Sequence, residues 1–248
     1  MHNYEQPGMP AAVREFISSF RYKIELHAHT SPASSCSELA PKRLIEMAKE
    51  KNYDEVVITN HFHAKGTFVD APDPVGKYLE DFRIAKEEGE RLGVRVLLGA
   101  EYRFTENNND YLVFGVDEKF LRDTVGEFSL TYEQFYEKYH CDELLIIQAH
   151  PYRTGLVAVD PAHEDGLETF NMHPNHNSRV AVAQIWAREQ GIPIMTVGTD
   201  LHHEEHQGLC SLRARTLPGN ERELVELLRS RDYLFEVGGC PVLPYAQF

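Results

Sequence analysis

The sequence lacks any apolar run long enough to cross a membrane. No stretch of its 248 residues approaches the roughly 20 consecutive apolar residues that a bilayer-spanning helix needs. Residues 1–16 also lack the charged-then-apolar build of a secretory signal. We therefore expect a cytoplasmic protein without a membrane partner. An apolar content of 42% is enough for a full hydrophobic core.

Closely spaced cysteines and an excess of positive charge are lacking as well. The four cysteines are scattered without a C-x-x-C spacing, which is typical of reduced thiols rather than of a disulfide framework. The 25 Lys and Arg residues are outnumbered by 39 Asp and Glu, which gives a formal net charge of −14. Duplex nucleic acid requires a basic stripe for its phosphates, so we expect no such partner.

Internal repeats, low-complexity tracts and long linkers are missing, and we predict a single domain over residues 1–248. Apolar strands alternate with amphipathic helices, beginning with a strand at 23–28, a helix at 40–52 and a strand at 55–60. This alternation is typical of parallel βαβ units, in a barrel or in an open doubly wound sheet. No glycine-rich nucleotide loop opens a helix, so we favour a (β/α) barrel.

Imidazole and carboxylate side chains follow the apolar strands. His27 and His29 stand at the end of the first strand, and residues two apart on a strand point to the same side. Because the carboxyl ends of barrel strands meet on one face, we expect such residues to gather around one pocket. The other strand ends carry His61, Glu101, His150, Asp200 and His202.

This set of side chains indicates a metal cluster. No cysteine stands at these strand ends, which argues against a closed thiolate zinc site. Imidazoles mixed with carboxylates suit Zn, Mn or Fe(II) better than Mg or Ca. The ligands are too many for one tetrahedral ion. We therefore expect two or three divalent ions, with a carboxylate such as Glu101 as a bridge.

Five ordered motifs resemble the PHP superfamily, the polymerase and histidinol phosphatase domain. The family pattern is H-x-H-T, T-D-H, G-x-E, H-P and S-D-x-H, and this chain has "HAHT", "TNH", "GAE", "AHP" and "TDLH" in that order. The stretch "LETFN" resembles the E-x-x-N segment of the family. The resemblance implies a distorted, TIM-like barrel of seven strands. It also implies metal-dependent hydrolysis of phosphate esters.

The resemblance further implies a ligand set for three ions. The first ion would be held by His27, His29, Glu101 and Asp200. The second ion would share Glu101 and add His150 and Asp110, a position where the family often has His. The third ion would be held by His61 and His202. Of these residues, we expect Glu101, Asp200 and His202 to act in catalysis.

Two departures from the family pattern concern the third ion. Asn60 replaces the usual aspartate before His61. The loop at 31–36, "SPASSC", lacks the third His that some members bring. Either Ser34, Ser35 or Cys36 substitutes for it, or the third position is weak or empty. We interpret Cys36 as a bystander, since a thiolate needs a local positive field. We also interpret His63 and His203 as neighbours of the site rather than ligands.

Three arginines are predicted to bind substrate, because guanidinium groups suit phosphate. They are Arg103, Arg153 and Arg179, and a loop with His173 and His176 is expected to form a rim. We therefore predict a phosphoesterase that hydrolyses a small phosphomonoester or nucleotide-type substrate through a metal-activated hydroxide. Two alternatives are an amidohydrolase-type enzyme, disfavoured by the lack of a lysine that could be carbamylated, and a catalytically reduced metal-binding domain.

Overall fold

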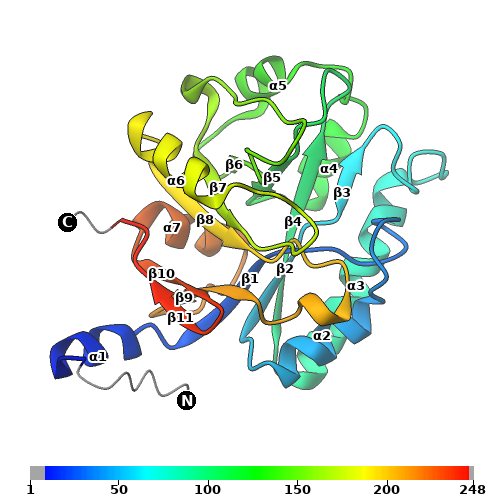
Figure 1. Ribbon diagram of the computed structural model, residues 1–248. Coiled ribbons are helices and arrows are strands. Elements are labelled where there is room, and N and C mark those ends of the chain that lie inside the picture. Colours follow the sequence, from blue (N-terminus) through cyan, green and yellow to red (C-terminus); the bar gives the residue numbers. More distant parts are fainter. Residues whose placement is uncertain (1–8, 246–248) are drawn as a thin grey trace.

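A curled β-sheet forms the centre of the molecule (Figure 1). The computed structural model describes residues 9–245. Residues 1–8 and 246–248 of the predicted domain lie outside the described residues, and so does the first half of the N-terminal stretch 1–16. Within the described range the sheet is 11-stranded. Its strands are β1 Tyr22–Ala28, β2 Glu55–Ile58, β3 His61–His63, β4 Arg95–Arg103, β5 Tyr111–Phe114, β6 Leu145–Gln148, β7 Gly166–Asn171, β8 Ile194–Gly198, β9 Cys210–Ala214, β10 Tyr233–Val237 and β11 Cys240–Val242.

Helices connect most of these strands. Their bounds are α1 Ala11–Ser18, α2 Pro41–Glu50, α3 Pro74–Leu92, α4 Glu118–Thr124, α5 Tyr132–Tyr139, α6 Val180–Glu189 and α7 Glu221–Ser230, with 3-10 turns η1 Pro161–His163 and η2 Glu204–His206. Local capping residues mark both ends of α3. The Asp73 side chain accepts a hydrogen bond from the Gly76 backbone, Pro74 follows, and Gly93 ends α3 at a φ of 69°. No helix in the described part of the chain is long and apolar enough to span a membrane.

The strand order is β11-β10-β9-β1-β2-β4-β5-β6-β7-β8, with β3 paired to β4. The α/β class is confirmed, and the sheet is a curled half-barrel; the predicted distorted, TIM-like barrel of exactly seven strands is not confirmed. β1 pairs in parallel with β2 on one edge and antiparallel with β9 on the other. Because β9 occupies this edge, β1 meets the segment that follows β8 only through an isolated parallel bridge between Ala28 and Leu201.

Not all neighbouring strands are parallel, contrary to the sequence prediction. β5 runs antiparallel to both β4 and β6. The link at 104–110 between β4 and β5 is too short for the crossover of about a dozen residues that a parallel pair requires. β9, β10 and β11 form an antiparallel extension, of which only β10 was expected from the sequence.

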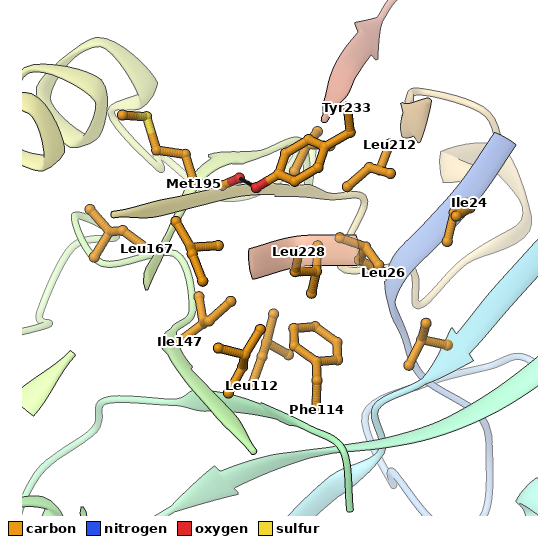
Figure 2. Close-up of a cluster of buried hydrophobic side chains, with 14 of the residues drawn as sticks. Ile24, Leu26, Leu112, Phe114, Ile147, Leu167, Met195, Leu212, Leu228 and Tyr233 are labelled. Atoms are coloured by element: carbon orange, nitrogen blue, oxygen red, sulfur yellow. Dashed lines mark hydrogen bonds between the residues drawn. The ribbon is translucent and has the colours of Figure 1, made fainter. Parts of the chain in front are cut away.

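Both faces of the sheet are buried, which explains the continuous apolar runs of the strands. Leu97 and Leu98 are neighbours on β4 but belong to different hydrophobic clusters, as alternation along a strand requires. On the inner face α7 contributes Leu228, which lies among Leu26, Leu112 and Phe114 (Figure 2). On the outer face, α2 and α3 pack together against the neighbouring strands (Figure 1).

A buried carboxylate links β1 to the segment that follows β8. Glu25 Oε1 accepts hydrogen bonds from the backbone N–H groups of His27 and Thr199, both at 3.0 Å. Glu25 Oε2 accepts from the Thr199 hydroxyl at 2.5 Å. Burial raises the pKa of Glu25 to about 7 despite these donors. This side chain therefore helps to bring the ends of β1 and β8 together.

A cluster of aromatic rings supports the short strand β3. Phe62 is fully buried, and its ring lies 5.1 Å from that of Phe68, 4.8 Å from Tyr78 and 4.9 Å from Tyr102. The flanking His61 and His63 take the other side of the strand and line a cavity. The ring of Phe62 thus holds the backbone that presents His61.

Phe62→Ala should lower the free energy of unfolding by about 3–5 kcal/mol, because it removes a large buried ring and leaves a cavity. Urea denaturation measures this change. Ile185→Ala is the matched control, since Ile185 is 56% exposed and its truncation should change stability by only about 0.5 kcal/mol. A loss below about 1 kcal/mol in Phe62→Ala would contradict the supporting role of the ring.

Candidate metal centre

The predicted ligands of the first ion converge at the carboxyl ends of their strands. His27 Nε2 lies 3.2 Å from Glu101 Oε1 and 3.5 Å from Asp200 Oδ1. His29 Nε2 lies 3.5 Å from Glu101 Oε2 and 3.4 Å from Asp200 Oδ1. All four side chains are at most 2% exposed. Two imidazole nitrogens and two carboxylates therefore face one small volume, as a divalent ion requires.

Backbone irregularities aim these side chains. The register between β1 and β2 shifts between Glu25 and Ala28, next to His27. Such irregularities re-aim side chains at the ends of strands. His150 and Asp200 both have left-handed backbone conformations, with φ of 31° and 54°. Unfavourable backbone conformations of this kind are retained where the surrounding structure holds them, often at functional sites.

Glu168 of β7 holds two of the ligand-bearing segments. Its Oε1 accepts a hydrogen bond from His27 Nδ1 at 2.8 Å, which leaves Nε2 of His27 free to bind a cation. Its Oε2 accepts from the backbone N–H of His150 at 2.9 Å and from Asn171 Nδ2 at 3.0 Å. The sequence alone indicated no role for Glu168, although this residue lies in the stretch that resembles E-x-x-N.

The second group of predicted ligands surrounds the other side of Glu101. His150 Nε2 lies 3.2 Å from Glu101 Oε1 and 3.7 Å from Asp110 Oδ2. Asp110 is fully buried and also forms a two-pronged pair with Arg103, whose Nε and Nη2 lie 2.6 Å from its two oxygens. An ion bound to Asp110 would therefore share this carboxylate with the guanidinium of Arg103.

The third group brings together His29, His61 and His202, whose ligand nitrogens all lie within 4.8 Å of one another. The His202 ring stacks on that of His29 at 4.3 Å. His61 Nδ1 also lies 2.7 Å from Glu101 Oε2, so this group adjoins the first. The structure therefore assembles all eight predicted metal ligands around Glu101 and Asp200.

Electrostatics favour a bound cation. Burial raises the pKa of Glu101, but His61 and His27 outweigh it and hold that pKa well below its usual value. Burial disfavours charge on His27, yet Glu168, Asp200 and Glu101 raise its pKa well above the usual range. Within residues 9–245, His27 Nε2, His29 Nε2 and Glu101 Oε2 are buried without a hydrogen-bond partner. These unpartnered atoms fit divalent ions.

Asn60 orders the loop after β1 rather than the ring of His61. Its Oδ1 accepts from the Thr30 backbone at 2.7 Å and from the Ser34 hydroxyl at 3.0 Å, and its Nδ2 donates to Thr30 Oγ1. The Thr30 hydroxyl donates in turn to Asp81 Oδ2 at 2.9 Å. Because that hydroxyl has only one proton, an amide matches this position better than a second carboxylate.

A cavity of about 440 Å³ opens above these groups. Arg103 and Arg153 line it together with Cys36, His173 and His176, among other residues. Arg153 lies 3.6 Å from Asp110, and His176 Nδ1 lies 3.3 Å from Asp200 Oδ2, a contact that no sequence pattern indicated. The structure does not bring Arg179 to this cavity. It is exposed, and its guanidinium donates to the carbonyl of Tyr152.

Cys36 lies closer to the ligands than a bystander would. Its Sγ is 3.2 Å from His202 Nε2. Partial burial raises the pKa of this thiol, but hydrogen bonds with His202 and His61 outweigh burial and lower the pKa to about 6. His63 and His203, in contrast, line the cavity outside the three ligand groups.

The fold and the ligand groups define an α/β protein with His, Glu and Asp groups that could bind metal ions. Comparison with protein-family models identifies a PHP domain over residues 25–189, which is more than half of the chain. The chain therefore belongs to the PHP family.

Solved structures with the same fold agree with this assignment. A two-domain protein from Bacteroides vulgatus ATCC 8482, described as containing a "predicted PHP-like metal-dependent phosphoesterase", is 17% identical with a TM-score of 0.62 over 86% of this chain. The match spans 64% of that longer protein. PsfC from Pseudomonas syringae PB-5123 is 16% identical with a TM-score of 0.61, over 84% of this chain and 89% of PsfC. No curated protein sequence matches the chain.

Glu168→Gln should weaken metal binding by roughly 10- to 100-fold. A glutamine has one acceptor oxygen and cannot serve both the His27 ring and the His150 backbone. Metal titration of the apoprotein by calorimetry, with metal analysis after dialysis, measures the loss. The exposed Glu226→Gln is the matched control and should bind metal as the unmodified protein does. Unchanged affinity in Glu168→Gln would show that the ligands need no such support.

Proposed function

We propose that this chain is a metal-dependent phosphoesterase acting on a small phosphomonoester or nucleotide-type substrate. The observation that carries the proposal is the buried cluster formed by His27 and His29 with Glu101 and Asp200. This cluster lies below a cavity that two arginines line. Membership of the PHP family supports it, as does the likeness to a Bacteroides protein described as a PHP-like metal-dependent phosphoesterase.

Two or three divalent ions, Zn, Mn or Fe, are the proposed cofactors. Such ions lower the pKa of bound water and polarise a phosphoryl oxygen. The chain's own part is to hold them in place. His27, His29 and Asp200 supply one set of ligands, and Glu101 lies between the sets. The hydrogen bond from His27 Nδ1 to Glu168 orients the imidazole, so that its Nε2 faces the site.

The two cavity arginines have different tasks in this proposal. Arg103 is engaged with both oxygens of Asp110, so its guanidinium forms a fixed positive wall. Arg153 has one longer contact with Asp110, at 3.6 Å, and its side chain is 24% exposed. Its remaining donors can therefore bind a phosphate and stabilise the charge that develops during hydrolysis.

The dimensions of the cavity point to a small substrate. A volume of about 440 Å³ lies within the range of ordinary small-molecule sites. The net charge of −14 disfavours a long polyanion, which would be repelled beyond the cavity mouth. The phosphoryl group would lie against the metal centre and Arg153. The leaving group would then face the rim that includes His173 and His176.

Purified protein loaded with Mn²⁺ or Zn²⁺ should release phosphate from small phosphomonoesters, and a chelator should abolish this release. Glu101→Gln should reduce kcat/KM by more than about 100-fold, since even residues behind metal ligands are worth 10- to 100-fold. The exposed Glu189→Gln is the matched control. Full activity in Glu101→Gln would refute the proposed centre. An amide of similar size that is cleaved in place of the phosphoester would refute the reaction class.

Arg153→Ala should lower kcat/KM by roughly 10- to 100-fold, the value of a charge-assisted hydrogen bond to phosphate. Arg179→Ala offers a matched comparison, because the structure leaves Arg179 outside the cavity and this change should have little effect. Steady-state kinetics on the best substrate of the panel decide between them. Equal losses of kcat/KM in both variants would show that Arg179 also binds substrate, contrary to its position outside the cavity.

A further inference from the structure

We infer that the thiolate of Cys36 is a ligand of the ion held by His61 and His202. This position is then a mixed sulfur and imidazole site, unlike the positions around Glu101 and Asp200. The inference rests on the metal centre of the proposed function, and it assigns the loop after β1 a chemical task.

The first argument is the geometry between Cys36 and His202. Nδ1 of His202 donates to the backbone carbonyl of Asp200 at 2.9 Å, so the other ring nitrogen, Nε2, carries the lone pair. That Nε2 lies 3.2 Å from the sulfur of Cys36. Without an ion, a single proton joins these two atoms in a hydrogen bond. A divalent ion can replace this proton and bind both sulfur and nitrogen.

A second observation points to an ion independently of the cysteine. The ligand nitrogens of His29, His61 and His202 lie within 4.8 Å of one another. His29 is fully buried, and its Nε2, which also faces Glu101 and Asp200, has no hydrogen-bond partner among residues 9–245. Three converging imidazoles with an unpartnered nitrogen are costly unless a cation binds them. Cys36 contacts this group from the side of the cavity.

The neighbouring serines do not offer the same ligand. The Ser34 hydroxyl donates to Asn60 Oδ1 at 3.0 Å and accepts from the His61 backbone at 2.9 Å, and it is buried. It therefore serves to shape the loop. Ser35 lines the cavity, but a neutral hydroxyl is a far weaker ligand than a thiolate for an ion bound by imidazoles. The sulfur of Cys36 is the best-suited atom of this loop.

Sulfur ligation has a chemical consequence for this position. A thiolate with imidazoles selects Zn²⁺ or Co²⁺ over Mg²⁺ and Mn²⁺, which favour oxygen ligands. Binding displaces the Cys36 proton to solvent, so that one proton is released for each ion bound through sulfur. The position nearest the loop should therefore differ in metal preference from the positions that contain only imidazole and carboxylate.

Titration of the apoprotein with Co²⁺ tests the inference, because a cobalt–thiolate bond gives an intense near-ultraviolet charge-transfer absorption. We expect this band in the unmodified protein and its loss in Cys36→Ser, with one ion held about tenfold or more weakly. Cys36→His should bind as many ions as the unmodified protein but without the band. Cys141→Ser is the matched control, since Cys141 is also exposed but does not line the cavity, and it should keep the band.

A second measurement uses the unmodified chain and so does not depend on the folding of a variant. Zn²⁺ should slow alkylation of Cys36 by iodoacetamide at least about tenfold while leaving Cys141 unaffected, as mass spectrometry of the peptides reports. The inference is overturned if the band is absent at full cobalt loading, if it persists in Cys36→Ser, or if Zn²⁺ gives no protection. Phosphate release without the band would remove the sulfur ligand and leave the proposed function standing. The band without any phosphate release would support the sulfur ligand and refute the proposed function.

Discussion

The burial of Glu101 and Asp200 side by side is the constraint on which the site depends. Both carboxylates are at most 2% exposed, and two buried negative charges are tolerated only beside cations. In the described residues this charge is met by imidazoles, and Glu168, Asp200 and Glu101 together raise the pKa of His27 well above its usual value. Divalent ions relieve the same charge without a proton. The strand ends thus gather His, Glu and Asp groups that could hold metal ions.

The groups behind the ligands determine how well the centre is held. Glu168 connects the ring of His27 to the backbone of His150, so one carboxylate from β7 orients residues of two other strands. Asn60 orders the loop that carries Cys36, and the Arg103–Asp110 pair sets the charge of the cavity wall. Each of these contacts is buried or partly buried, where hydrogen bonds and ion pairs are least weakened by water. Positioning of this kind is what separates a metal cluster from a chance gathering of histidines.

Much of the fold could be predicted from periodicity, and the failures have physical causes. The stop of α3 at Gly93 is a local effect of neighbouring residues, and so is the cap by Asp73 that the structure adds at its start. The short strand β3 and the direction of β5 could not be predicted in this way. β3 is held by ring contacts of Phe62 with distant residues, and strand direction depends on link length and pairing partner. The antiparallel pairing of β9 with β1 likewise joins segments distant in sequence, and periodicity does not predict it.

The sequence by itself determined the ligand chemistry, because residue types and their places at strand ends are local facts: His27, His29 and Glu101 could be named before any contact was known. Only the tertiary structure decided which of the surrounding residues act on them. It brought Glu168 and Cys36 to the ligands, engaged Asp110 with Arg103, and left Arg179 outside the cavity. The reason is that these contacts join segments up to 166 positions apart, and their geometry is set by the packing of the whole sheet.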